Sequence, residues 1–337
     1  MFNSIPNHPL VSYNTFHIKA IAGVFIEFDE KGEFLSWLGT TKPSPESIFV
    51  MGGGSNILLT KDLPGIVLHP VNDLIEVVGD DKSGILVRAG AGTVWDRFVE
   101  WCVGRNLGGL ENLSLIPGSV GASPIQNIGA YGTEAGNLVE SVDVIDLANG
   151  RSFTLSTAEC RFGYRDSIFK HPEGRHWLVW SVTYRLQREP LVNLTYEPLK
   201  KYFSDNPSPT LHAIREAVIA IRRSKLPDPD DTGSAGSFFK NPVIPVSQAD
   251  DLKKEYPGLP VYPHDNQTIK VSAGWLIEQC GWKGFREGPV GVYPAQALVL
   301  VNYGGATAKQ IIELSERIRA SVLERFGINL ENEVRIL

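Results

Sequence analysis

The stretch Gly108-Gly-Leu-Glu-Asn-Leu-Ser-Leu-Ile-Pro-Gly-Ser-Val-Gly-Ala-Ser-Pro-Ile-Gln-Asn-Ile-Gly-Ala-Tyr-Gly, residues 108–132, mixes many glycines and two prolines with Ile, Leu and Val. Connecting loops lie on the surface and rarely carry so many apolar residues, so we expect this segment to be buried. The N–H groups of a buried backbone need acceptors, which a diphosphate or a flavin ring could supply. This favours a cofactor site over tight structural packing.

A second glycine-rich segment precedes it, Ile48-Phe-Val-Met-Gly-Gly-Gly-Ser-Asn-Ile-Leu-Leu. Gly52, Gly53 and Gly54 allow main-chain N–H groups to converge on an anion, and Ser55 and Asn56 add polar side chains. The segment lacks the lysine of a P-loop and the spacing of a GxGxxG fingerprint, which disfavours both of those nucleotide folds. It is open to two interpretations, a phosphate cradle or a hairpin turn, and a hairpin turn is the simpler one for the segment by itself.

The segment Gly233-Ser-Ala-Gly-Ser-Phe-Phe-Lys-Asn-Pro places a hydroxyl, an ammonium and an amide close together, on Ser237, Lys240 and Asn241. Its glycines and closing proline argue against a helix interior. The segment is equally well interpreted as a binding site or as a turn that enters a half-buried strand.

Arg165 lies beside Tyr164 and Asp166 in the run Cys160-Arg-Phe-Gly-Tyr-Arg-Asp-Ser-Ile-Phe-Lys. A guanidinium held by its neighbours can bind a carboxylate or stabilise an enolate derived from one. Taken alone, a surface ion pair between Arg165 and Asp166 is the simpler interpretation.

Near the end of the chain, Glu331 and Glu333 flank Asn332 in an otherwise apolar terminal run. Strand alternation would place both glutamates on one face, where one of them could face a site. A solvated edge strand explains the same pattern.

The composition of the 337-residue chain limits the possible partners. Its net charge of -6 and pI of about 5.7 argue against binding to nucleic acid phosphates. Cys102, Cys160 and Cys280 are odd in number and widely spaced, which predicts free thiols in a reducing compartment and no metal site. We expect no signal peptide and no membrane insertion, because residues 1–20 lack a basic stretch followed by an apolar run.

Apolar periodicity and breaker residues predict the elements. Helices are expected at residues 93–105, 211–224, 271–280 and 307–326, and strands at 22–28, 47–51, 57–59, 65–69, 85–90, 142–146, 177–184, 297–302 and 333–337. The breaker Lys225-Leu-Pro-Asp-Pro marks a plausible domain boundary. We predict three domains, over residues 1–72, 73–226 and 227–337.

Seven segments in this order resemble the family of UDP-N-acetylenolpyruvylglucosamine reductases, in its longer, type I branch. They are Asn14-Thr-Phe, Gly53-Gly-Ser-Asn, Ile116-Pro-Gly-Ser-Val-Gly-Ala-Ser-Pro-Ile-Gln-Asn-Ile-Gly-Ala-Tyr-Gly, residues 160–170, Lys225-Leu-Pro, Gly236-Ser-Phe-Phe-Lys-Asn-Pro and Leu330-Glu-Asn-Glu-Val-Arg. Each motif is modest alone, but the ordered set is specific and runs from residue 14 to residue 335.

The resemblance implies an α+β fold with a two-part FAD-binding region of the vanillyl-alcohol-oxidase/PCMH-like type and a C-terminal α+β substrate domain. It implies FAD and NADPH as cofactors and a sugar nucleotide as the small-molecule substrate. The residues that it places at FAD are Gly52, Gly53, Gly54, Ser55, Asn56, Pro117, Gly118, Ser119, Gly121, Ala122, Ser123, Gln126, Asn127, Gly129, Ala130 and Tyr131.

The resemblance also assigns catalytic roles. Hydride from reduced flavin goes to C3 of the enolpyruvyl group, and negative charge develops at C2 and its carboxylate. Arg165 and Glu333 match the residues that stabilise this charge, and Ser237 matches the donor of the proton to C2. The residues matched to substrate or nicotinamide binding are Tyr164, Tyr196, Lys225, Asn241 and Gln296. The chain departs from the family pattern at Tyr293, in a region where a histidine often precedes Gln-Ala-Leu.

Two other functions compete with a reductase. One is a related oxidase that passes electrons to oxygen, although the glycine-rich segments offer no histidine or cysteine for covalent flavin attachment. The other is a sugar-nucleotide binding protein without turnover, which would have no need for Arg165, Ser237 and Glu333 together. We expect a cytoplasmic monomer.

Overall fold

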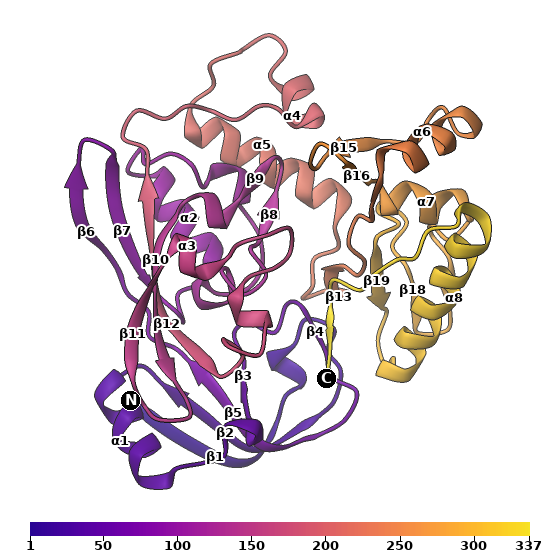
Figure 1. Cartoon of the computed structure of the whole chain (residues 1–337). Helices are drawn as coiled ribbons and strands as arrows, with labels where there is room; N and C mark the ends of the chain where they lie inside the picture. Colours follow the sequence, from indigo (N-terminus) through magenta and orange to yellow (C-terminus); the bar gives the residue numbers. More distant parts are fainter. The chain divides into compact units, whose positions relative to one another are not determined.

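The computed structural model describes residues 1–337, and the chain divides into two compact units (Figure 1). The first unit comprises Met1–His8, Ile21–Gly53 and Leu63–Arg222; the second comprises Pro9–Ala20, Gly54–Asp62 and Arg223–Leu337. The division into three consecutive domains stays a prediction.

A four-stranded sheet of order β1-β2-β5-β3 opens the first unit. Its elements are β1 (Phe2–Pro9), β2 (Ile21–Phe28), α1 (Lys31–Thr41), β3 (Ile48–Val50) and β5 (Leu63–Pro70). The strands β2 and β3 both run parallel to β5, and α1 connects β2 to β3. The helix buries Phe34 and Leu38, which stand four residues apart and therefore share one face.

The second sheet of this unit has five antiparallel strands in the order β11-β10-β12-β7-β6. Their bounds are β6 (Ile75–Asp81), β7 (Gly84–Gly90), β10 (Val139–Asp146), β11 (Ser152–Ser156) and β12 (Trp177–Leu186). Helix α2 (Trp95–Val103) covers it with Trp95 and Phe98, whose ring centroids lie 5.9 and 5.0 Å from that of Tyr184 on β12. The apolar residues of α2 thus lie on one face of the helix, and this face packs on the sheet.

The two sheets share a small core. Phe28 and Leu68 of the first sheet pack with Ile145 and Leu178 of the second, and all four side chains are buried. The remaining elements of the unit are β8 (Gly129–Ala130), β9 (Thr133–Glu134), α3 (Thr157–Cys160), α4 (Glu197–Tyr202) and most of α5 (Leu211–Lys225). Strand β12 has no exposed residue, which explains why its sequence reads as an apolar run.

The second unit combines short sheets with three helices. Its elements are β4 (Ile57–Leu58), β13 (Gly233–Ser237), β14 (Val243–Pro245), α6 (Val246–Glu255), β15 (Val261–Pro263), β16 (Thr268–Val271), α7 (Ala273–Gln279), β17 (Arg286–Glu287), β18 (Val290–Val292), β19 (Val299–Asn302), α8 (Ala308–Phe326) and β20 (Arg335–Ile336). The sheets have the orders β13-β19-β18-β17, β14-β16-β15 and β20-β4. A capping box of Thr307 and Gln310 begins α8, and Gly327 at φ 64° ends it.

The predicted helices at 93–105, 211–224, 271–280 and 307–326 are confirmed as α2, α5, α7 and α8, with ends that differ by a few residues. Each predicted strand has a counterpart in β2, β3, β4, β5, β7, β10, β12, β19 and β20. Helices α1, α3, α4 and α6 had not been predicted. The α1 sequence contains Gly32, Gly39 and two threonines, which have low helix propensity.

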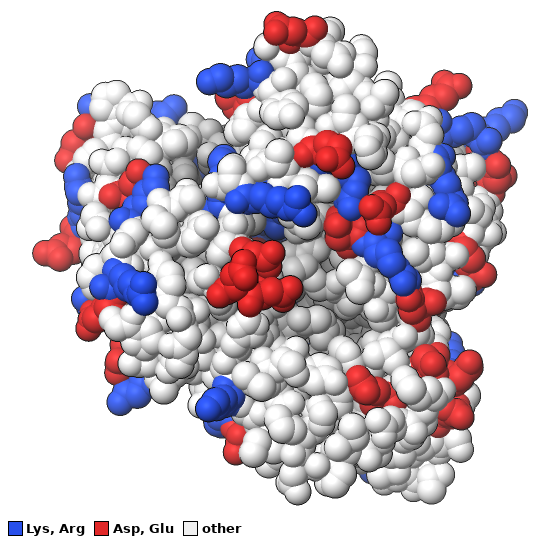
Figure 2. Space-filling view, turned by 180° about the vertical axis from the view of Figure 1, so that it is seen from behind, with Lys and Arg blue, Asp and Glu red and all other residues white.

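Positive and negative side chains alternate in small groups on the face shown in Figure 2, with no broad basic area. This agrees with the net charge of -6. No helix of the chain is both long and apolar enough to cross a bilayer.

Candidate active site

The two glycine-rich segments meet within the first unit. A side chain on Gly53 would place its Cβ 2.9 Å from the Cα of Gly118, and one on Gly52 would place it 2.6 Å from the Ser119 hydroxyl oxygen. A side chain on Gly53 would require the opposing main chain to shift, and one on Gly52 would require the Ser119 side chain to move. The two glycines therefore allow a close approach of two main chains that are far apart in sequence.

Main-chain N–H groups at this meeting point lack main-chain acceptors. No carbonyl of the backbone accepts from the N–H groups of Gly52, Gly53 or Gly118. Gly118 has φ 118°, a conformation open to glycine but not to other residues, and Pro117 beside it is exposed. Main-chain donors without acceptors on a partly exposed glycine backbone fit an anion such as the diphosphate of FAD.

The rest of the 116–132 segment is held by buried polar contacts. The Ser123 hydroxyl donates to the Val120 carbonyl and lies 2.6 Å from the Tyr184 hydroxyl. The Asn127 side chain donates to the Gly163 carbonyl and accepts from the Gly136 N–H. These two predicted cofactor residues use their side chains inside the protein, so only their main chains are available to a ligand.

Arg165 is directed into the glycine-rich segment. Its guanidinium donates to the Gly129 carbonyl at 2.9 Å and lies 5.5 Å from the Tyr164 ring centroid. The Asp166 carboxylate accepts from His171 Nε2 at 2.9 Å and not from Arg165. Arg165 has φ 55°, a conformation that costs a non-glycine residue energy and often marks a functional site.

Tyr196 lies against Tyr131 in an edge-to-face contact with ring centroids 5.0 Å apart. The two tyrosines come from the segment before α4 and from the end of the glycine-rich segment. Asn112, fully buried, links the same two segments by donating to the Tyr131 and Asn193 carbonyls. Asn112 was not among the predicted site residues. Its position in the glycine-rich segment at 108–132, which was expected to be buried, could have indicated it.

In the second unit, Ser237 is the last residue of β13 and pairs with Val299 of β19. Gly236 before it has φ 67° with open space around it, and Phe238 and Phe239 after it are buried. The structure therefore agrees with the interpretation of a turn and a strand, with the two phenylalanines fully buried, and the interpretation as a binding site stays a prediction. Ser237 itself is half-buried.

The end of the chain runs beside this serine. Glu333 donates its N–H to the Phe238 carbonyl, and the Asn56 amide donates to the Glu333 carbonyl at 3.2 Å. Arg335 in turn donates its N–H to the Asn56 carbonyl. Hydrogen bonds thus link the segments of three predicted residues that are distant in sequence, Asn56, Ser237 and Glu333, within one unit.

The two neighbouring glutamates have different environments. Glu331 has 76% of its side chain exposed and forms an ion pair with Lys240 at 3.1 Å. Glu333 is half-buried. Strand alternation was expected to place both glutamates on one face, with one of them able to face a site, but residues 331–334 do not form a regular strand.

Asn241 and Gln296 both reach the start of α7. The Asn241 side-chain oxygen accepts from the Ala273 N–H at 3.0 Å, and a side chain on Gly274 would come 3.0 Å from Gln296 Oε1. Lys225 ends α5, and Tyr293 donates its N–H to the carbonyl of Val299, which is the pairing partner of Ser237. Gly52, Gly53, Tyr164, Arg165 and Tyr196 belong to the first unit, and Lys225, Ser237, Asn241, Gln296 and Glu333 belong to the second.

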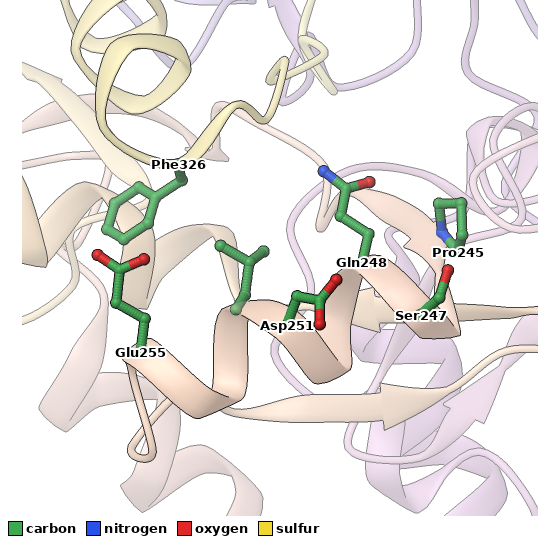
Figure 3. A pocket seen from close by; sticks show the side chains of 7 residues that line it. Pro245, Ser247, Gln248, Asp251, Glu255 and Phe326 are labelled. Carbon is green, nitrogen blue, oxygen red and sulfur yellow. The ribbon is translucent and has the colours of Figure 1, made fainter.

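A hollow of about 400 Å³ lies elsewhere on the second unit (Figure 3). Gln248, Asp251 and Glu255 of α6 point to it, and Phe326 at the end of α8 lies at its side. None of the predicted site residues lines this hollow. No group of three or more His, Cys, Asp or Glu side chains is arranged to hold a metal ion.

Comparison with known proteins defines the class. An FAD-binding domain matches residues 38–156, and the C-terminal domain of UDP-N-acetylenolpyruvoylglucosamine reductase matches residues 228–337. With the glycine-rich meeting point, this defines an FAD-dependent oxidoreductase.

Whole-chain relatives define the family. The chain is 44% identical over 330 residues to a UDP-N-acetylenolpyruvoylglucosamine reductase of Bacteroides fragilis, covering 98% of this chain and 99% of the relative. It is 45% identical to one of Pseudomonas aeruginosa, covering 96% of each. A reductase of the same name from Thermus caldophilus has a similar crystal structure, with a TM-score of 0.66, 25% identity, and coverage of 100% and 98%. The chain belongs to the UDP-N-acetylenolpyruvoylglucosamine reductase family, and the predicted fold class is confirmed.

Proposed function

We propose that the protein reduces UDP-N-acetylglucosamine enolpyruvate to UDP-N-acetylmuramate, a step of peptidoglycan synthesis, with NADPH as the reductant and FAD as the carrier. The observation that carries this proposal is the meeting of the two glycine-rich segments, with their free N–H groups, in a chain of this family. Bound FAD supplies a group that accepts hydride from NADPH and delivers it to C3 of the enolpyruvyl substrate.

Gly52, Gly53 and Gly118 would hold the FAD diphosphate through their N–H groups. Peptide N–H groups bind an anion without bringing a counter-charge, and the close Gly53–Gly118 approach brings the main chains of both segments to one place. The remaining predicted contacts between Pro117 and Tyr131 would line the flavin through their main chains.

Arg165 would stabilise the negative charge that develops at C2 and the adjacent carboxylate. A cation placed before the reaction begins lowers the barrier without reorganisation. The hydrogen bond to the Gly129 carbonyl and the left-handed backbone support this role, because both fix the direction of the guanidinium.

Ser237 would donate the proton to C2, and Glu333 would orient the donor or stabilise the charge. A serine hydroxyl is a weak acid, so its position must compensate. The pairing of Ser237 with Val299 and the hydrogen bonds of the next residue support this role, since the Phe238 N–H donates to the Leu298 carbonyl and the Phe238 carbonyl accepts from the Glu333 N–H.

The sugar nucleotide and NADPH would use the same polar residues in turn. Those residues are Tyr164, Tyr196, Lys225, Asn241 and Gln296. A cytoplasmic location and a monomeric state belong to this proposal; the buried thiols of Cys102 and Cys160 support a reducing compartment.

An anaerobic flavin titration tests the function. The protein saturated with FAD should lose its yellow colour on addition of NADPH and regain it on addition of the enolpyruvyl sugar nucleotide. UDP-N-acetylglucosamine, which lacks the enolpyruvyl group, is the control and should leave the flavin reduced. A protein that takes up no FAD, or whose reduced flavin is reoxidised only by oxygen, would overturn the proposal.

A further inference from the structure

Leu115 has an unusual backbone conformation at the entrance to the 116–132 segment. Its φ of 57° lies in the left-handed region, which a leucine avoids because its Cβ approaches the following carbonyl. The next residues are Ile116 and Pro117, where the predicted FAD contacts begin. A strained residue persists only where its surroundings determine its conformation.

Both main-chain polar groups of Leu115 are held by charged side chains. Its N–H donates to Asp96 Oδ1 at 2.5 Å, and its carbonyl accepts from Arg222 Nε at 3.1 Å. Hydrogen bonds to charged groups are stronger than those between neutral groups. Together they clamp the peptide units on the two sides of the Leu115 Cα.

A second arginine fixes the Asp96 carboxylate. Arg215 Nη1 and Nη2 donate to Asp96 Oδ1 and Oδ2 at 2.6 and 2.9 Å, and the Arg215 side chain is only 7% exposed. A bidentate pair orients the carboxylate plane, which leaves Oδ1 directed at the Leu115 N–H. Glu100, the other acidic neighbour of Arg215, is 3.8 Å away and 70% exposed, so it contributes little.

Arg222 connects the clamp to the far end of the same segment. Its guanidinium also hydrogen-bonds the Tyr131 hydroxyl, so one side chain holds Leu115 before the segment and Tyr131 within it. Arg215 and Arg222 are seven residues apart on α5, which places them on one face two turns apart.

We propose that Asp96, oriented by Arg215, is a positioning residue that holds Leu115 in the left-handed conformation and so sets the path of the main chain into the FAD-binding segment. The inference rests on the proposed placement of FAD along residues 116–132. Without the Asp96 carboxylate, Leu115 returns to an ordinary conformation, and Gly118 and its N–H group move away from the diphosphate position.

A glycine at position 115 provides the decisive test, because glycine adopts the left-handed conformation without cost. Asp96→Ala should raise the Kd for FAD, measured by titration of the flavin-free protein, by about 5- to 30-fold, the factor that corresponds to the cost of the left-handed conformation. Leu115→Gly alone should change the Kd by less than about threefold. The double variant should return to within about threefold of Leu115→Gly.

Two controls separate the possible outcomes. Glu100→Gln touches the same arginine without touching Leu115, and its Kd should equal that of the parent. Asp96→Asn retains an oxygen that can accept from the Leu115 N–H and should fold even if Asp96→Ala does not. It should raise the Kd for FAD less than Asp96→Ala does, and Leu115→Gly should remove this increase as well. If the effects of Asp96→Ala and Leu115→Gly on the Kd for FAD multiply in the double variant, the proposed positioning role of Asp96 is wrong.

The proposed role of Asp96 and the proposed position of FAD can be tested separately. Gly118→Ala should weaken FAD binding if the diphosphate lies at the glycine-rich meeting point. If Gly118→Ala weakens FAD binding while Asp96→Ala lowers only the thermal midpoint of the flavin-free protein, the clamp is wrong and the placement stands. If neither variant changes the Kd, the placement itself is wrong.

Discussion

At the scale of single residues, the proposed reaction depends on backbone conformations that fix the positions of polar side chains and main-chain N–H groups. Arg165 and Leu115 are both non-glycine residues with positive φ, and both border the glycine-rich segment. The backbone energy stored at such residues, about 1–2 kcal/mol each, must be supplied by contacts such as those from Gly129 and Asp96.

Glu331 and Glu333 offer a matched pair for testing which carboxylate acts. We expect Glu331→Gln to change turnover less than about twofold and the free energy of unfolding by less than about 1 kcal/mol, because it breaks an exposed ion pair with Lys240. Glu333→Gln should slow reoxidation of reduced flavin by the substrate about 10²- to 10³-fold, as the loss of a group that stabilises the transition state does. Stopped-flow measurement of each half-reaction checks this. A larger effect from Glu331→Gln than from Glu333→Gln would reverse the assignment.

At the scale of secondary structure elements, the second sheet supports the glycine-rich segment through one buried hydrogen bond. The Tyr184 hydroxyl of β12 lies 2.6 Å from Ser123 in the segment. Because the Ser123 proton goes to the Val120 carbonyl, Tyr184 is the donor. Complete burial raises the pKa of Tyr184, so its hydroxyl keeps the proton at all ordinary pH values.

Tyr184→Phe should therefore lower the free energy of unfolding by about 1 kcal/mol, the usual net value of a lost hydrogen bond, while the aromatic packing on Trp95 and Phe98 is kept. Urea denaturation of the flavin-free protein measures the change. Tyr202→Phe, at a tyrosine that is 58% exposed, is the control and should have no effect. Equal stability of the Tyr184→Phe variant and the parent would show that the hydrogen bond contributes nothing.

Long periodic elements could be predicted from the sequence, because their burial is local and repeats. Helix α5, predicted at residues 211–224, is observed at Leu211–Lys225. The contacts that build the site could not be predicted in this way. The Arg165–Gly129 hydrogen bond joins residues 36 apart and the Asn56–Glu333 hydrogen bond joins residues 277 apart, so each depends on the packing of whole elements. The family motifs supplied the site residues, whereas the positioning role of Asp96 had no motif.

At the scale of the whole molecule, the reactivity of the three cysteine thiols shows whether each unit stays folded. Cys102 and Cys160 are fully buried in the first unit, and burial raises the pKa of Cys160 to about 12. Cys280 in the second unit is partly exposed, and burial also raises the pKa of its thiol.

Under native conditions, we expect a thiol reagent to modify one cysteine, Cys280, more slowly than a free thiol, because the reactive thiolate is scarce when the pKa is raised. The rate should increase with pH beyond the range in which an ordinary thiol levels off. Cys102 and Cys160 should react only when the first unit opens. Mass spectrometry of the labelled protein, with Cys280→Ser as the control, counts the sites. Rapid labelling of Cys102 or Cys160 in the folded protein would contradict the burial described here.

The most direct test of the proposed chemistry is the single-turnover reoxidation of reduced flavin in Ser237→Ala. NADPH should bleach the flavin of this variant as fast as that of the parent, because proton delivery to C2 belongs to the other half-reaction. Reoxidation by the enolpyruvyl sugar nucleotide should be slower by about 10²- to 10⁴-fold, the usual contribution of a positioned proton donor. Equal reoxidation rates in the variant and the parent would contradict the account and remove Ser237 from the mechanism.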